Sequence, residues 1–308
     1  MILSICIPTF NRSNYLKKCL GSVELATKNV EIPIEVYVSN NNSEDDTDEV
    51  LKSWHFSNPN VYFRFVKQEI NIGPLSNIYH IANAAEGEFL FWCTDDDTVT
   101  PNAIEEAIQI IQDERSCFIR FALVVHDIAR DSIYIHGRHF SRESEDSYEK
   151  KFIKIFMLTH ILTGTLVTRD ICISIPIEKR SNIYPMAQWC CSAFGRVQYS
   201  SLPAAIHTYG NEVFWGKDVE MDSVGIQGSQ SANDFVSSLN YIEDAGKNRE
   251  LQKQIYFAFH NKIYKKSLNQ LQFKLSLQKR QVIQHNIIEK VKKLILNLKF
   301  NKLLSNFK

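Results

Sequence analysis

The sequence predicts an α/β protein with a mostly parallel β-sheet, helices on both faces of that sheet, and a basic helical C-terminal region. Three observations predict this class. Short apolar runs rich in β-branched and aromatic residues alternate with amphipathic segments in the first third of the chain, polar residues follow each of those runs, and residues 249–308 contain no Gly or Pro and almost no acids. Strands that alternate with helices of crossover length pair in parallel, because right-handed crossovers lay each helix on the sheet.

The elements are expected in a regular order along the chain. Four apolar runs predict strands, and the amphipathic segments between them predict helices. The expected strands lie at 2–9, 33–40, 61–68 and 88–94, and the expected helices at 12–26, 45–54 and 74–87, with a further helix from Pro101. Beyond these, 116–137 indicates strands or a hairpin, 148–162 a helix, and 164–171 a strand with a turn.

The bulk composition excludes several classes of protein. With 308 residues, 44% of them hydrophobic, the chain is long enough for a large core. The opening residues "MILSICIPTF" lack a basic leader and a small-residue cleavage site, so we expect a buried strand there rather than a signal peptide or a membrane span. The seven cysteines are scattered without CxxC spacing, which argues against a disulfide framework and a zinc site and indicates a reduced cytosolic setting.

Polar residues follow all four predicted strands of the first third. Ligands of a parallel sheet bind at the carboxyl ends of its strands, and these positions carry Thr9–Arg12, Asn40–Ser43, Asn71 with Gly73, and Asp95–Asp97. No GxGxxG or GxxxxGK[ST] loop is present to hold phosphates. A divalent cation would neutralise a diphosphate instead, and three successive carboxylates supply the hard oxygen ligands that Mg²⁺ or Mn²⁺ prefers.

Each of these loops also has a purely structural interpretation. An acidic triplet before Pro101 is typical of a helix N-terminus, because acids favour the positive end of the helix dipole. The run "NNNSEDD" suits a turn and a helix cap, and Asn71 and Gly73 suit a tight turn. Asn77, inside the next helix, is expected to be exposed or capping. For the acids, the position directly after a buried strand, beside three other polar loops, favours the metal interpretation.

Three stretches carry a resemblance to a known family. "SICIPTFNRSNYLKKCLGSV", "IEVYVSNNNSEDDT" and "NIGPLSNIYHIANAAEGEFLFWCTDDDTVTP" stand in the order of the motifs of glycosyltransferase family 2, and from Ile2 to Ile111 the chain resembles these inverting enzymes of the GT-A fold. The resemblance implies a nucleotide-sugar-binding α/β half at 1–115 and an acceptor-binding half of the same catalytic domain at 116–232. The basic helical region would then occupy 233–308.

The resemblance also implies roles for individual residues. The donor nucleotide-sugar would be bound by Pro8, Thr9, Phe10, Asn11, Arg12, Asn40, Asn41, Asn71, Gly73, Asp95 and Asp96. The metal on its diphosphate, Mn²⁺ or Mg²⁺, would be held by Asp95, Asp96 and Asp97. Three aspartates in a row leave the register of the DxD motif open, because Asp95 and Asp97 satisfy the spacing while alignment through Pro101 permits Asp96.

One departure from the family pattern concerns the nucleotide base. Members usually place an aspartate or an Asp-Asp pair after the second strand, where this chain has Asn40 and Asn41. A carboxylate accepts a hydrogen bond from the N3–H of uracil or thymine, whereas an amide can accept or donate. Cytosine, whose N3 is an acceptor, is therefore compatible with this loop, and UDP-, CDP- and dTDP-sugars all stay open as donors.

No motif identifies the general base. The resemblance places it in the acceptor half, where a carboxylate must take the proton of the attacking acceptor hydroxyl. The candidates are Glu212, Asp218 and Glu220 in "GNEVFWGKDVEMD", an irregular stretch suited to folding over the donor as a lid. The structural alternative for each is a solvated loop acid.

The C-terminal region is strongly basic. Residues 249–308 hold 14 Lys and Arg against two acids, although the whole chain has zero net charge. Apolar residues at helical spacing between Ile287 and Leu298, with Lys290, Lys292 and Lys293 beside them, predict a basic amphipathic helix. Such a helix suits an anionic membrane surface, and it suits equally well packing on its own domain or on a second subunit. No nucleic-acid-binding module accompanies the charge, so we expect no nucleic-acid partner.

The sequence therefore predicts a metal-dependent inverting glycosyltransferase. It would transfer a sugar to a glycan acceptor, lipid-linked, of an O-antigen or capsule, as a peripheral protein on the cytoplasmic face of a bacterial inner membrane. A catalytically silent nucleotide-sugar- or glycan-binding partner in a membrane assembly complex is the alternative hypothesis. A nucleotidyltransferase would need a glycine-rich basic loop early in the chain, and the sequence has none.

Overall fold

The computed structural model describes residues 1–112, 116–127, 131–136, 147–180, 182–209, 237–242, 248–251 and 254. The strands are β1 (Leu3–Thr9), β2 (Ile34–Asn40), β3 (Val61–Lys67), β4 (Phe89–Trp92), β5 (Thr98–Val99), β6 (Phe118–Asp127), β7 (Ser132–His136), β8 (Thr165–Thr168) and β9 (Val197–Tyr209). The helices are α1 (Ser13–Thr27), α2 (Thr47–Ser53), α3 (Pro74–Ala84), α4 (Ala103–Gln112), α5 (Tyr148–Phe156), α6 (Arg169–Ser174) and α7 (Pro185–Ser192), with short 3-10 helices η3 (Ile177–Lys179) and η4 (Ser238–Tyr241).

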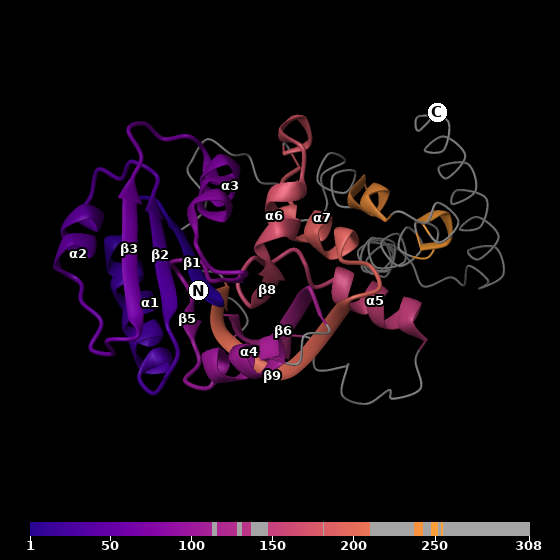
Figure 1. The fold of residues 1–308 in the computed structure, drawn as a ribbon, viewed down its shortest axis with the longest axis horizontal. Helices are drawn as coiled ribbons and strands as arrows, with labels where there is room; N and C mark the ends of the chain where they lie inside the picture. The colour runs from indigo at the N-terminus through magenta and orange to yellow at the C-terminus, as the bar shows by residue number, and fades with distance from the viewer. Residues whose placement is uncertain are drawn as a thin grey trace, which may run out of the picture. The chain divides into compact units, whose positions relative to one another are not determined.

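The described strands form one sheet with the order β3-β2-β1-β4-β8-β6-β9-β5, and β7 pairs with β6 (Figure 1). The first four strands in this order are parallel. At β8 the direction reverses, because β8 is antiparallel to both β4 and β6. Strand β9 then pairs in parallel with β6 and antiparallel with β5, so the second half of the sheet is mixed.

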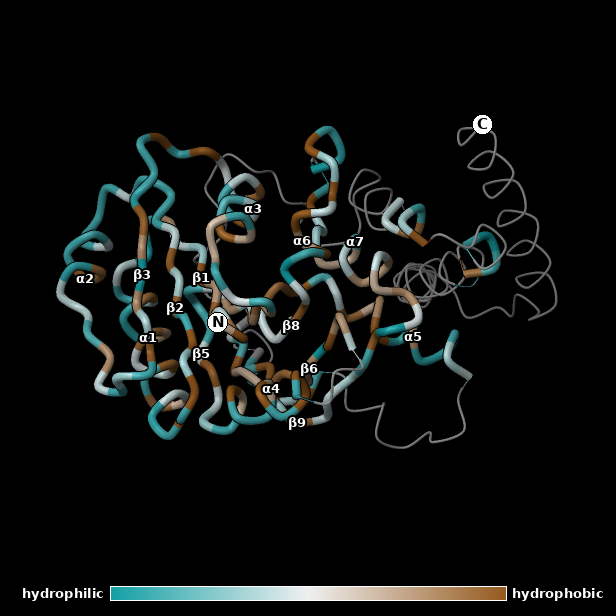
Figure 2. Tube along the Cα trace, viewed as in Figure 1, coloured by the Kyte–Doolittle hydropathy of each residue, from teal (hydrophilic) through white to brown (hydrophobic). Residues whose placement is uncertain are grey.

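The parallel half is covered on both faces. Leu3, Ile5 and Ile7 of β1 are fully buried in one apolar cluster that includes residues of β2, β4, α1, α2 and α4. Their neighbours Ser4 and Cys6 point the other way and are also fully buried, as expected for a strand covered on both faces. Figure 2 shows hydrophobic segments along the strands and a largely hydrophilic exterior at α2 and the adjoining loops.

Helices α3, α6 and α7 pack together on the opposite face. There Trp92 of β4 stacks on Trp189 of α7 with 5.3 Å between ring centroids, and Tyr79 of α3 meets Trp189 edge-on at 6.3 Å. Both tryptophans are fully buried. This aromatic contact joins the first half of the chain to the second, because β4 belongs to the parallel half and α7 follows β8.

Most of the elements expected before residue 164 are present, with shifted ends, whereas the turn expected at the end of 164–171 is the start of helix α6, which follows β8 directly. The hairpin expected within 116–137 is the antiparallel pair β6 and β7, and the helix expected at 148–162 is the shorter α5. Helix α4 begins at Ala103 rather than at Pro101, and the two-residue strand β5, which the sequence did not indicate, precedes it. Strands from both predicted halves, 1–115 and 116–232, belong to the same sheet.

Little of the predicted C-terminal region is described. Within 233–308 the structure describes only residues 237–242, 248–251 and 254, so the expected amphipathic helix at 287–298 lies outside the described residues. None of the described helices combines the length and the apolar content needed to cross a bilayer.

Candidate functional site

The loops after β1 and β2 are tied together at the carboxyl edge of the sheet. The backbone N–H of Asn41 donates to the carbonyl of Thr9 at 2.9 Å, and the N–H of Asn11 donates to Oγ of Ser43 at 2.8 Å. Asn11 and Asn42 have positive φ angles of 52° and 64°, a conformation that Asn adopts more readily than most residues. Both loops therefore turn sharply and hold their polar groups at this edge.

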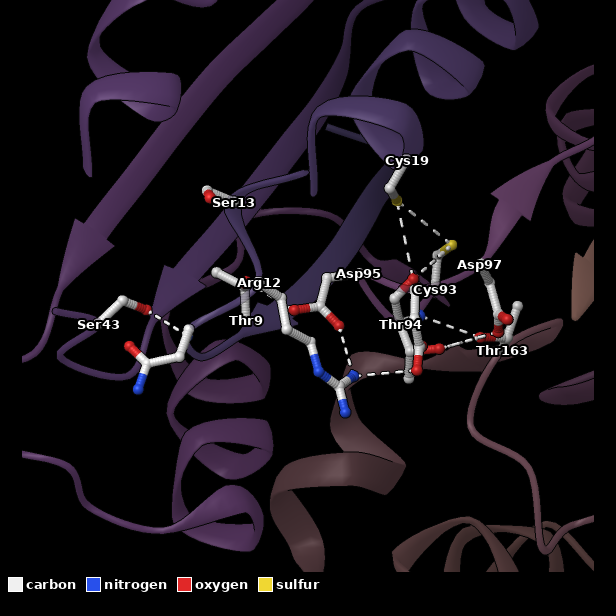
Figure 3. Close-up of polar contacts among 12 residues, drawn as sticks. Thr9, Arg12, Ser13, Cys19, Ser43, Cys93, Thr94, Asp95, Asp97 and Thr163 are labelled. Atoms are coloured by element: carbon white, nitrogen blue, oxygen red, sulfur yellow. Dashed lines mark hydrogen bonds and ion pairs between the residues drawn. The ribbon is translucent and has the colours of Figure 1, made fainter. Parts of the chain in front are cut away.

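The acidic loop after β4 meets the loop after β1 through Arg12. One guanidinium nitrogen, Nη1, lies 3.0 Å from Oδ1 of Asp95 and 3.0 Å from Oδ2 of Asp96. Thr9 donates its hydroxyl to the other oxygen of Asp95 at 2.7 Å (Figure 3). Adjacent carboxylates repel one another, and here an arginine from a different loop supplies the positive charge between them.

Burial dominates the electrostatics of Asp95. Desolvation raises the pKa of this carboxyl to about 7, although the nearby Arg12 opposes the shift. For Arg12, burial alone would lower the pKa, but the charges of Asp95 and Asp96 outweigh it and the pKa is raised. One guanidinium thus does not fully compensate the carboxylates at neutral pH, and this edge of the sheet favours additional positive charge.

Asp97 is held by a different set of partners. Its Oδ2 accepts from Oγ1 of Thr94 at 2.8 Å, and its Oδ1 lies 2.8 Å from Nδ1 of His207 on β9. The hydroxyl of Thr163, in the loop before β8, accepts the backbone N–H of Thr94 and also lies within hydrogen-bond distance of the Thr94 hydroxyl (Figure 3). Burial alone would lower the pKa of His207, but the hydrogen bond to Asp97 and its charge raise it. Segments far apart in sequence therefore fix the third aspartate.

Arg120 of β6 lies under this loop. Its side chain is fully buried, and Nη1 donates to the carbonyl of Thr163 and to Oγ1 of Thr165. Burial lowers its pKa to about 10, although Tyr199 and Asp97 oppose the shift. A buried guanidinium without a paired carboxylate among the described residues is costly, and its field acts on the neighbouring acidic loop.

The loops after β2 and β3 are joined by amides. Asn41 donates Nδ2 to Oδ1 of Asn71 at 2.8 Å and accepts the backbone N–H of Ile72 on Oδ1 at 2.9 Å. Gly73, with a φ of 83°, donates its N–H to Asn71 as well. The loops after all four strands of the parallel half thus converge on one edge, as the sequence predicts.

A comparison with known proteins decides the family. The sequence model of the family described as "Glycosyl transferase family 2" matches residues 4–172, which is more than half of the 308 residues. The chain belongs to glycosyltransferase family 2. Within this family, it is 31% identical over 104 residues to abequosyltransferase RfbV of Salmonella typhimurium, a match that covers 34% of this chain and 31% of that protein.

Further relatives point the same way. The chain is 32% identical over 108 residues to a GalNAc(5)-diNAcBac-PP-undecaprenol beta-1,3-glucosyltransferase of Campylobacter jejuni, covering 35% of this chain and 33% of that protein. The matches thus span about a third of the length of these curated relatives.

Solved structures share the fold. TarS of S. aureus in complex with UDP superimposes with a TM-score of 0.56 at 14% identity, covering 83% of this chain and 70% of that one. The mannosyltransferase PcManGT of Pyrobaculum calidifontis, in complex with GDP-Man and Mn²⁺, gives 0.54 at 13% identity, covering 82% and 69%. The expected GT-A architecture is confirmed.

The residues at the acidic loop fit, in their chemistry, the divalent cation that the GT-A fold implies. Carboxylates of Asp95, Asp96 and Asp97 provide hard oxygen ligands at one edge, and Arg12 already lies as a shared cation between two of them. In the part of the chain that the structure describes, no three or more His, Cys, Asp or Glu side chains are arranged around one common point. Binding of an ion between Asp95 and Asp96 would therefore require Arg12 to move.

The structure corrects one expectation and leaves others outside its reach. Asn77 is buried rather than exposed or capping, because its amide accepts from Oγ of Ser39 at 2.6 Å and donates to the carbonyl of the same residue at 3.1 Å. Pro8 lies within β1, and Phe10, in the loop after it, is 36% exposed. The three base candidates lie outside the described residues: Glu212, Asp218 and Glu220.

Sequence reasoning missed three residues beside the acidic loop. Thr163 and His207 bond to this loop directly, and Arg120 bonds to Thr163 and lies close enough to Asp97 to interact with its charge. Only the histidine carried a sequence signal, as a ligand-type side chain in the apolar strand "PAAIHTY". The pairing of β5 with β9 brings it to Asp97, and such long-range pairing cannot be read from one strand alone.

Proposed function

We propose that this protein is a metal-dependent inverting glycosyltransferase that moves a sugar from a nucleotide-sugar donor to a glycan acceptor in bacterial surface polysaccharide biosynthesis. One observation carries the proposal: three successive aspartates at the carboxyl edge of the parallel strands, next to polar loops from three other strands, in a chain of this family. That edge is where open α/β sheets bind their ligands.

The relatives support the class of donor and of acceptor. TarS binds UDP and UDP-GlcNAc, and PcManGT binds GDP-Man with Mn²⁺. One curated relative is an abequosyltransferase, and the name of another contains PP-undecaprenol. By analogy we assign this protein a nucleotide-sugar donor and an acceptor linked to a lipid.

The proposed chemistry is a single displacement at the anomeric carbon. A bound Mn²⁺ or Mg²⁺ would stabilise the negative charge of the departing diphosphate. Asp95, Asp96 and Asp97 would hold that ion, and Thr9 and Arg12 orient Asp95 through their hydrogen bonds. A carboxylate from the acceptor half takes the proton of the attacking hydroxyl, and Glu212, Asp218 and Glu220 stay the candidates.

The basic C-terminal region suits a peripheral position on the cytoplasmic face of the inner membrane. Its 14 basic residues against two acids would attract anionic headgroups, which places the protein near a lipid-linked acceptor. Association with a second copy through the same region is the competing proposal. The first proposal predicts binding to anionic vesicles, and the second predicts a dimer in solution.

The test is thermal melting of the full chain with UDP, CDP, dTDP and GDP, each in Mn²⁺ and again in excess EDTA. A nucleotide at 100 times its Kd adds about 2.7 kcal/mol to stability, and we expect that shift only with Mn²⁺. Asp95→Asn and Asp97→Asn should remove the shift and slow metal-dependent release of nucleoside diphosphate from the donor about a hundredfold or more. Asp170→Asn, at an exposed position in α6, is the matched control and should keep both.

Two outcomes would count against the proposal. Full activity of both aspartate variants would remove the metal assignment. Nucleotide binding without any donor hydrolysis would favour the catalytically silent binding protein. That hypothesis is consistent with the hydrogen bonds that Asp95 and Asp97 already make to other residues of the protein.

A further inference from the structure

The three aspartates lie on a turn that begins at Thr94, and all three polar groups of this threonine are bonded. Its carbonyl accepts the backbone N–H of Asp97 at 3.1 Å, and its hydroxyl donates to Oδ2 of Asp97 at 2.8 Å. Its own N–H donates to Oγ1 of Thr163 at 2.9 Å. The first two contacts close the turn on itself, whereas the third ties the start of the turn to the loop before β8.

The hydrogen bonds between the two threonines have a fixed direction. Their hydroxyl oxygens lie 2.9 Å apart, and either hydroxyl could in principle be the donor. A carboxylate only accepts, so the single hydrogen of the Thr94 hydroxyl goes to Asp97. Thr163 must therefore donate to Thr94, while its oxygen accepts the N–H of Thr94. A directed chain of hydrogen bonds thus runs from Thr163 through Thr94 to Asp97 (Figure 3).

Thr163 is itself fixed from both sides of its loop. Its side chain is fully buried, and its carbonyl accepts from Nη1 of Arg120 on β6. The next residue, Gly164, donates its N–H to the carbonyl of Trp92 at 3.0 Å and accepts the N–H of Phe121 at 2.9 Å. Strands β4 and β6 therefore both bond to this loop, and Thr163 contacts the acidic turn from a position that the sheet defines.

We propose that Thr163 is a positioning residue for the reaction: its hydroxyl fixes the turn at residues 94–97, and with it the carboxylates that would hold the cation. The inference rests on the proposed function, since it concerns the same acidic loop. Asp96 lies within this turn and has 30% of its side chain exposed, so a displaced turn would also displace the carboxylate that is open to solvent. Groups that orient metal ligands through hydrogen bonds typically change metal affinity by about 10- to 100-fold when they are lost.

Thr163→Val tests the hydroxyl at almost constant shape. The substitution removes the acceptor of the Thr94 N–H and the donor to the Thr94 hydroxyl. The matched control is Thr165→Val, because Thr165 is also fully buried and also accepts from Arg120, at 3.0 Å, but its hydroxyl bonds to Arg120 rather than to the acidic turn. Both variants should melt at a lower temperature than the wild type, since each loses a buried hydrogen bond.

The experiment measures the Kd of Mn²⁺ for the full chain by calorimetry, in the presence of whichever of UDP, CDP, dTDP and GDP raises the melting temperature most. We expect Thr163→Val to weaken Mn²⁺ binding about tenfold or more and Thr165→Val to leave it unchanged. Thr163→Ser, which keeps the hydroxyl, should bind Mn²⁺ as the wild type does. A purely structural role would lower both melting temperatures without separating the two valine variants in Mn²⁺ affinity.

Thr94 provides a second test of the same chain. Thr94→Val removes the middle hydroxyl and should also weaken Mn²⁺ binding about tenfold or more, whereas Thr94→Ser should not. Because the two threonines act through one chain, the loss in the double valine variant should be smaller than the product of the two single losses. If Thr163→Val does not fold, the comparison of Thr94→Val with Thr94→Ser decides the question.

Two results would overturn different statements. Equal Mn²⁺ affinity of the folded Thr163→Val and Thr165→Val proteins, or of Thr94→Val and Thr94→Ser, would overturn this inference and leave the proposed function standing. Wild-type protein that binds none of the four nucleotides with Mn²⁺ would overturn the proposed function itself.

Discussion

Three neighbouring aspartates at residues 95–97 differ in what compensates their charge. Asp95 is buried and bonded to Thr9 and Arg12, while the side chain of Asp96 is 30% exposed and shares the same arginine. Asp97 is buried and faces His207 instead. Removal of Arg12 should therefore affect Asp95 and Asp96, whereas removal of His207 should affect Asp97.

Arg12 gives the first prediction at the residue scale. Arg12→Gln leaves Asp95 and Asp96 without their shared cation, and we expect a loss of about 1–3 kcal/mol in unfolding free energy when measured in EDTA. Mn²⁺ should recover more stability in the variant than in the wild type, because no guanidinium stands between the two carboxylates. Urea unfolding with and without Mn²⁺ measures both effects.

The control for this prediction is Lys52→Gln. Lys52 pairs with Asp48 on the surface of α2, with 65% of its side chain exposed, and such pairs contribute little. Its loss should change stability by less than about 0.5 kcal/mol in either buffer. An Arg12→Gln protein as stable as this control in EDTA would contradict the role given to the guanidinium.

His80 gives a pH-dependent prediction. Nε2 of His80 on α3 lies 3.4 Å from the hydroxyl of Tyr37, and burial lowers its pKa below the ordinary 6.5. The unfolded chain then takes up the proton first, so stability present above pH 6.5 is lost as the pH falls through the lower, folded value. Between about pH 7 and 5, the melting temperature of His80→Gln should fall less steeply than that of the wild type. The control is His55→Gln, at an exposed position, whose melting temperature should follow that of the wild type.

At the scale of single elements, the junction before β4 tolerates no side chain. A Cβ on Gly87 would lie 2.4 Å from the backbone N of Ser4 and 2.6 Å from the carbonyl carbon of Leu3. The hydroxyl of Ser4 also receives the N–H of Gly87 and donates to the buried carboxylate of Glu35. This contact lets β4 lie directly beside β1, so the acidic loop depends on a glycine ahead of its strand.

One glycine variant tests that contact and a second is its control, and the two should change the unfolding free energy in opposite directions. Gly87→Ala should lower the unfolding free energy by about 2–3 kcal/mol, since the clashing atoms are backbone and cannot yield locally. Gly21→Ala, in the middle of α1, meets only the tip of Trp54 at 3.8 Å and should raise it by about 0.5–1 kcal/mol. Equal effects of the two substitutions on urea unfolding would contradict this account.

At the scale of the whole molecule, the sequence predicts the parallel half better than the mixed half. Local composition is enough to predict strands such as "ILSICIPT" and "PIEVYVSN". The loops after them lie at one edge because the strands are parallel. Strand β5 has two residues and exists only through its pairing with β9, so no local pattern indicates it. The burial of Asn77 is likewise not indicated by its own helix, because its amide bonds to Ser39 of β2.

The same division applies to the candidate site. The three aspartates and the asparagine loops follow from motif and strand order. The compensating groups Arg120, Thr163 and His207 come from β6, the loop before β8 and β9. Their proximity is set by long-range pairing and by a register shift between Phe121 and Leu123, which a single sequence does not encode in readable form.

The basic C-terminal region gives a prediction about membrane binding. Vesicles rich in anionic lipid should bind the full protein, and neutral vesicles should not. Lys290, Lys292 and Lys293 changed together to Glu should weaken that binding more than a hundredfold, since each basic residue near the surface contributes about 1 kcal/mol. Nucleotide binding should be unchanged in the same variant.

A matched triple variant controls for net charge. Lys17, Lys18 and Lys52 are exposed on α1 and α2, and changing all three to Glu should preserve vesicle binding. If the wild-type protein does not bind anionic vesicles but sediments as a dimer, the competing proposal, association with a second copy, is favoured.

The stacked indoles of Trp92 and Trp189 give this protein a built-in optical reporter. Their ring planes are 24° apart and their centroids 5.3 Å, close enough for the electronic transitions of the two rings to couple and leave a paired signal in circular dichroism. Trp92 lies three residues before Asp95, on the strand that leads into the acidic loop. Movement of that loop on ligand entry should therefore change the shape of the dichroism spectrum, without any label and in real time.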